Sequence, residues 1–146
     1  MVGLSTEIQN AILDELIGVG GKLEDATVEL FTNSPDFSTL LTAASFTAPT
    51  FTGYAAQTPT WTTFTGPNGT RYAASEPLVF NPTDAVGLPQ IVNGYWVREV
   101  TSGDYLAGGY FANPLTVSFA DQAFHCVAVV PIDRLQLTIS GEGAII

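Results

Sequence analysis

The chain has 146 residues, of which 46% are hydrophobic and only 12% are charged. Its 14 acidic and 4 basic residues leave a formal net charge of −10, which argues against binding to nucleic acid or to anionic lipid. The hydrophobic share excludes a disordered chain, and the length suits one domain with a real core. No apolar run approaches the roughly 20 residues that span a bilayer, and the first residues lack the regions of a signal peptide. We therefore expect synthesis in a cytoplasm, with neither nucleic acid nor membrane as a partner.

The first predicted element is a short α-helix over residues 5–17. Thr6 and Gln9 have the spacing of a capping box, and glycines from Gly18 onward end the helix. One wide apolar stripe follows its length, formed by Ile8, Ile12, Leu13, Leu16 and Ile17. A stripe this wide needs a partner, which is either the chain's own sheet or another molecule. Residues 1–25 are thus predicted as a helix and a Gly-rich linker.

From Ala26 onward the apolar pattern has a period of two, which predicts strands. The first covers 26–31, residues 37–47 fit a loop or one helical turn, and further runs cover roughly 50–56, 60–65, 70–75, 77–81, 91–99, 105–112, 115–119, 124–130 and 134–140. The segment 66–69 (Gly-Pro-Asn-Gly) is the clearest hairpin signal. Short strands with frequent Gly and Pro predict that 26–146 is a single antiparallel β-sandwich, jelly-roll-like or immunoglobulin-like.

Threonine, with 18 copies, takes positions where Lys or Glu would usually protect a sheet surface. The densest patch covers residues 58–65, and one explanation is that such faces meet protein. The candidate interface residues in the strands are aromatic: Trp61, Phe64, Tyr72, Tyr95 and Tyr110. An alternative is a sugar-stacking platform formed by Trp61, Tyr72, Tyr95, Trp96 and Tyr110. Because Tyr95 and Trp96 are adjacent on a strand, at most one of them is expected to face the core.

No catalytic, cofactor or metal site is predicted. His125 and Cys126 are adjacent in a strand and point to opposite faces, so Cys126 is expected to be a small buried hydrophobe. Four acids at strand ends could serve a glycan hydrolase if paired, but turn residues bonding to nearby backbone are the simpler interpretation: Asp84, Asp104, Asp121 and Asp133.

Several segments together resemble a known class of proteins. They are residues 28–33 (VELFTN), 51–55 (FTGYA), Trp61, 94–97 (GYWV) and 106–117 (LAGGYFANPLTV). The succession is similar to that of small β-rich virion structural proteins of tailed bacteriophages, over roughly residues 26–140. The resemblance implies a non-enzymatic decoration (cement) protein in the virion. Its implied partners are the major capsid protein and copies of itself, as a trimer or dimer. The alternatives are a tail or baseplate adhesin that binds carbohydrate, and a β-sandwich glycan hydrolase.

Overall fold

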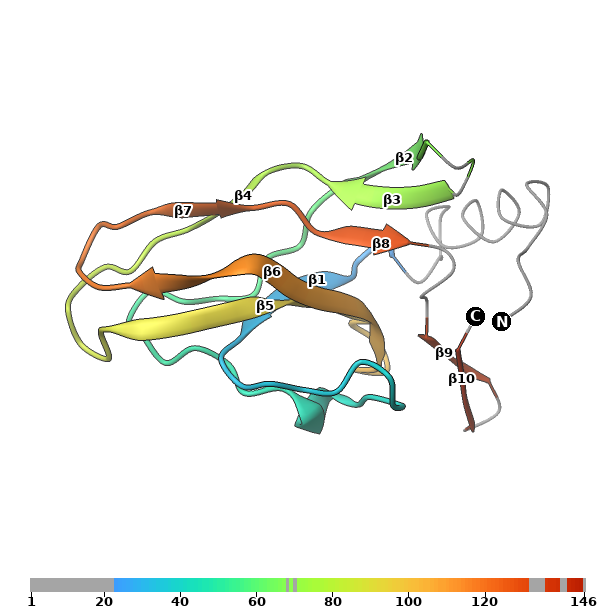
Figure 1. Cartoon of the computed structure of the whole chain (residues 1–146), viewed down its shortest axis with the longest axis horizontal. Helices are drawn as coiled ribbons and strands as arrows, with labels where there is room; N and C mark the ends of the chain where they lie inside the picture. Colours follow the sequence, from blue (N-terminus) through green and yellow to red (C-terminus); the bar gives the residue numbers. More distant parts are fainter. Residues whose placement is uncertain (1–22, 68, 70, 132–135, 140–141, 146) are drawn as a thin grey trace.

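The computed structural model describes residues 23–67, 69, 71–131, 136–139 and 142–145, and these form antiparallel sheets without an α-helix (Figure 1). The predicted helix over 5–17 lies outside the described residues. The strands are β1 (Thr27–Phe31), β2 (Trp61–Thr65), β3 (Arg71–Ser75), β4 (Leu78–Phe80), β5 (Gln90–Arg98), β6 (Tyr105–Val117), β7 (Phe124–Cys126), β8 (Val129–Pro131), β9 (Gln136–Ile139) and β10 (Glu142–Ile145). A 3-10 helix, η1, covers Ala43–Ser45. The mainly β, antiparallel prediction is confirmed.

Two three-stranded sheets organise the described chain, in the orders β1-β5-β6 and β2-β3-β8. The β4–β7 pair continues the β3–β8 pair along the same direction. At the junction the Ser75 amide donates to the Ala128 carbonyl, and the Ala128 amide donates to the Ser75 hydroxyl, both at 2.9 Å. These two bonds satisfy buried backbone where the ladder is interrupted.

The inter-sheet core is the apolar cluster to which both sheets contribute. Its fully buried members include Val28 and Leu30 from β1, Val92 from β5 and Val130 from β8. Leu23 also belongs to this cluster with 0% exposure, although the sequence places it in the Gly-rich linker. The alternation of apolar residues in β1 and β5 is what turns one face of each strand toward this core.

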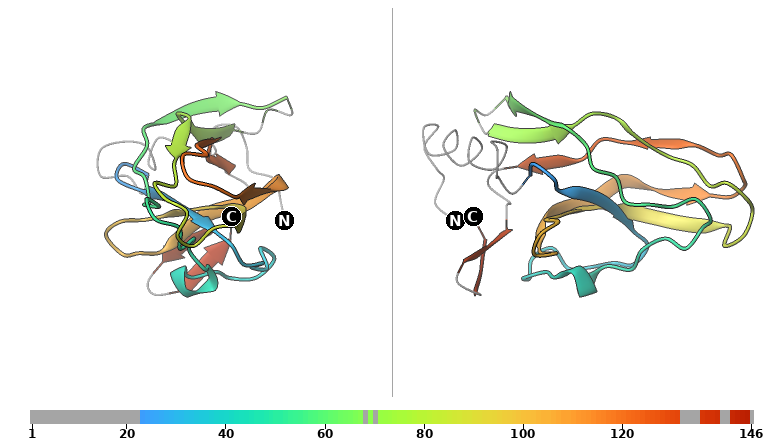
Figure 2. Two further views of the ribbon diagram at one scale, coloured as in Figure 1. Left: turned by 90° about the vertical axis from the view of Figure 1, so that its left-hand side faces the viewer. Right: turned by 180° about the vertical axis from the view of Figure 1, so that it is seen from behind.

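The opposite face of the β1-β5-β6 sheet is also covered, by the loop that follows β1 and contains η1 (Figures 1 and 2). This loop and the sheet form an aromatic cluster: Phe31, Phe37, Phe46, Trp96, Tyr105 and Tyr110. The Phe46 and Trp96 rings stack at 4.6 Å with an interplanar angle of 6°. The sheet is therefore buried on both faces along part of its length.

Two details of the strand prediction are wrong. Residues 50–56 are a loop, in which Gly53 has a φ of 94° and the Tyr54 amide donates to the Phe51 carbonyl. The expected strands 105–112 and 115–119 are one strand, because β6 continues through Pro114. Between the pairs Val92–Leu115 and Gly94–Tyr110, β5 advances two residues and β6 advances five. This bulge leaves Pro114 exposed, where its missing N–H costs no ladder bond.

Candidate interaction surface

Residues 124–131 alternate strictly between the core and the outside. Phe124, Cys126, Ala128 and Val130 belong to the inter-sheet core. The residues between them therefore point to the opposite side of the sheet. They are His125, Val127, Val129 and Pro131.

The neighbouring strands extend this outward side. On β2 and β3, Phe64 and Tyr72 are cross-strand partners whose rings stack at 5.5 Å with an interplanar angle of 21°. On β4, Val79 pairs with His125. We call these positions the outer face: Thr62, Phe64, Tyr72, Ala74, Val79, His125, Val127, Val129 and Pro131.

The outer face holds neither acidic nor Lys or Arg side chains, although the chain has a net charge of −10. Three of its apolar side chains are about half exposed: Phe64 at 45%, Val79 at 48% and Val127 at 47%. The nearby carboxylate of Glu76 accepts from the amide and the hydroxyl of Thr60, so local polar groups hold it. An apolar, uncharged sheet face of this kind is typical of a surface that binds another protein.

The predicted interface residues are divided among several places. Phe64 and Tyr72 lie together on the outer face, whereas Trp61 and Tyr95 pack against the inter-sheet core. Tyr110 is 48% exposed at the rim of the aromatic cluster, on the other side of the molecule, and its hydroxyl donates to the Pro35 carbonyl. The helix residues Ile8, Ile12, Leu13, Leu16 and Ile17 lie outside the described residues.

Tyr95 and Trp96 differ from the expectation that one of them would be left outside. Tyr95 faces the inter-sheet core, and Trp96 is only 3% exposed within the aromatic cluster. Adjacent strand residues do point to opposite faces, but here the loop after β1 covers the second face. The aromatic residues considered for a sugar platform are consequently not gathered on one surface.

Asp84, Asp104 and Asp121 lie in loops at two opposite ends of the sheets. The Asp121 amide donates to the Pro82 carbonyl, which places it beside the loop that carries Asp84 before β5, whereas Asp104 follows β5. A strand of the nine residues of β5 is about 30 Å long, far more than the roughly 5–9.5 Å between glycosidase carboxyls. Asp84 accepts from the Val86 amide at 2.8 Å, as a turn residue does. Asp133 lies outside the described residues.

Cys126 and His125 point to opposite faces, as predicted. Cys126 is 5% exposed in the core, and burial raises the pKa of its thiol to about 11. Across the described part of the chain, no three His, Cys, Asp or Glu side chains are grouped so that they could hold a metal ion. Within the same residues, no helix has the length and apolar character needed to cross a bilayer.

Comparisons of the chain with protein-family models, with curated proteins and with solved structures found no match.

Proposed function

We propose that this chain is a non-enzymatic virion structural protein, a decoration protein that binds the outside of a phage head and stabilises the shell. It is made in the host cytoplasm and acts in the virion, with the major capsid protein and copies of itself as partners, as dimers or trimers. We also propose that its two sheets form a β-sandwich of jelly-roll-like or immunoglobulin-like type. The resemblance of residues 26–140 to phage structural proteins supports this function.

The observation that carries the proposal is the uncharged outer face with its exposed Phe64, Val79 and Val127. A shell protein that binds through this face buries these side chains, and each gains about 25 cal/mol per Å² of apolar area removed from water. The absence of carboxylates on the face also limits the repulsion that a chain of net charge −10 meets in a crowded lattice. Many weak contacts of this kind become strong together on a symmetric shell.

The test is quantitative mass spectrometry of gradient-purified virions of the phage that encodes the chain. The expected result is a fixed molar ratio of this chain to the major capsid protein. That ratio should be close to the one expected if the chain fills one set of symmetry-equivalent sites on the shell. Absence of the chain from purified heads overturns the proposal.

A second experiment tests the surface itself. The Val79→Asp and Val127→Asp variants should bind heads that lack the chain at least tenfold more weakly than the natural protein. The matched control is Val86→Asp, which makes the same change at a side chain that is 68% exposed in the β4–β5 loop, off the outer face. Equal binding by all three variants contradicts the role of the outer face.

The adhesin is a second candidate because the exposed Phe64 stacks on the half-buried Tyr72, and aromatic faces also bind sugar rings. A glycan array separates the two functions. Saturable binding of one glycan class that is lost in Phe64→Ala favours the adhesin, and no binding favours the decoration protein.

A further inference from the structure

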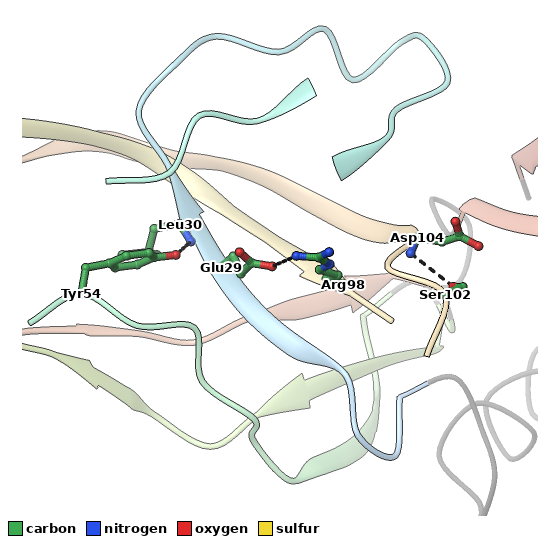
Figure 3. A network of polar contacts seen from close by, with 6 residues as sticks. All are labelled: Glu29, Leu30, Tyr54, Arg98, Ser102 and Asp104. Atoms are coloured by element: carbon green, nitrogen blue, oxygen red, sulfur yellow. Dashed lines mark hydrogen bonds and ion pairs between the residues drawn. The ribbon is translucent and has the colours of Figure 1, made fainter. Parts of the chain in front are cut away.

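The outer edge of β1 is occupied along its length. Val28 exchanges two backbone hydrogen bonds with Gln57, at 2.7 and 3.1 Å. Two residues further on, the Leu30 amide donates to the Tyr54 hydroxyl at 2.9 Å (Figure 3), and the Thr32 amide then donates to the Thr47 carbonyl. Groups that would otherwise attract another strand are thus satisfied within the chain.

The edges of β8, β4 and β6 are closed in different ways. At β8, the Tyr95 hydroxyl donates to the Val129 carbonyl at 2.8 Å and accepts from the Val129 amide at 3.0 Å, so one side chain takes the place of a neighbouring strand. At β4, the Gln57 side-chain amide donates to the Val79 carbonyl. The edge of β6 is interrupted by the bulge that contains Pro114.

Among the residues that the structure describes, none protects the outer edge of β2 in these ways. Its five residues pair with β3 in one unbroken register, and among the described residues no other backbone bonds to them. Charged side chains, prolines and bulges usually keep the edges of sheets from pairing with each other. The β2 segment, WTTFT, contains none of the three. In an antiparallel ladder every second residue of an edge strand directs its N–H and C=O outward, so β2 offers an open ladder to an extended strand.

We propose that a second copy of this chain pairs with this edge, antiparallel, about a two-fold axis at Thr63. The pairing joins β2-β3-β8 with its symmetry mate into one six-stranded sheet and brings Phe64 beside the partner's Thr62. A second copy fits because a two-fold axis at Thr63 sets each large ring opposite a small side chain: Trp61 lies across from Thr65 of the second copy, and Phe64 lies across from its Thr62. Two copies of net charge −10 also approach with least repulsion where each carries no charge.

The dimer is expected to be weak. Five paired residues bury much less than the roughly 800 Å² per partner of a stable interface, so association should occur at about 0.1 mM and become strong only where copies are held together. The inference does not rest on the proposed function, since it needs only a second copy and no capsid. A failure of head binding therefore leaves it intact.

Cysteine cross-linking of the full chain tests the register. Thr63→Cys places two sulfurs across the axis on directly opposed residues, whose Cα atoms would lie about 5 Å apart, within reach of a disulfide. The control Thr65→Cys is two residues away on the same strand, which puts its Cα about 14 Å from the same atom of the second copy. Mild oxidation should cross-link the first variant at least tenfold faster. Equal rates at both positions, or none at either, overturn the proposal.

Sedimentation equilibrium of the natural protein and of one charge variant provides the second test. Thr62→Lys places like charges on the shared edge and should weaken the dimer at least tenfold, whereas Thr101→Lys makes the same change in the exposed β5–β6 turn and should leave it unchanged. A natural protein that stays monomeric up to about 1 mM overturns the proposal. So does an equal effect of the two lysines.

Discussion

Tyr95→Phe removes one oxygen atom and leaves the packing of the ring in place. In the natural protein that oxygen donates to the Val129 carbonyl at 2.8 Å and accepts from the Val129 amide at 3.0 Å. The Tyr95 side chain packs against the inter-sheet core, and this burial raises the pKa of its hydroxyl. The substitution therefore strips both backbone groups of Val129 at the β8 edge of their partner.

Each of the two lost hydrogen bonds is worth about 0.5–1.5 kcal/mol net, so the free energy of unfolding should fall by about 2 kcal/mol. For a chain of this length that corresponds to a decrease in Tm of about 6 °C. The assay is urea denaturation followed by circular dichroism, with the expectation of a lower midpoint and an unchanged slope. The control is Tyr72→Phe, because the Tyr72 hydroxyl bonds to none of the described residues.

The control should change the free energy of unfolding by less than about 0.5 kcal/mol. Equal, small effects of the two substitutions would mean that water satisfies Val129 in the variant. In that case the closure of the β8 edge by Tyr95 contributes nothing to stability.

Gly94→Ala should destabilise the fold by about 3 kcal/mol in urea denaturation, because its Cβ would lie 2.1 Å from the Gly109 carbonyl oxygen; Gly109→Ala, which meets open space, should be nearly neutral. Burial raises the pKa of Tyr54 to about 12, so between pH 10 and 12 the folded chain keeps a proton that the unfolded chain has lost. The free energy of unfolding should therefore fall as the pH rises from 10 to 12, and it should fall less steeply in the Tyr54→Phe variant. The Cys126 thiol, with its pKa of about 11, should react with an aromatic disulfide reagent at neutral pH only after unfolding, and fast reaction of the native protein contradicts its burial.

Alternation along single strands was readable from the sequence, and contacts between distant segments were not. The hairpin signal at 66–69 correctly predicted the pairing of β2 with β3, and the period of two correctly predicted β1, β5 and the strands around 124–131. The same period in residues 50–56 was misleading, because Gly53 adopts a positive φ that turns the chain. Pro114 was read as a break because the bulge that accommodates it depends on β5, a partner that local sequence does not specify.

The candidate surface could be predicted only in part. Phe64 and Tyr72 were predicted as aromatic interface residues, whereas Val79 and Val127 were missed among ordinary strand valines. Strict alternation over 124–131 would have found Val127, since it follows a core cysteine. The role of Tyr95 could not be foreseen, because its hydroxyl reaches a backbone 34 residues away.

Gln57 links the two sheets on one side of the molecule, through its backbone to β1 and through its side chain to β4. A lateral pull on β4 is therefore passed directly to β1, and it does not act on the side-chain packing between the sheets alone. If a bound partner pulls on the outer face, Gln57 transmits part of the force from β4 to β1, so both sheets bear it. On the other side, the two hydrogen bonds between the Tyr95 hydroxyl and the Val129 backbone link β5 to β8 in the same way, so both sides of the fold resist sliding of one sheet over the other.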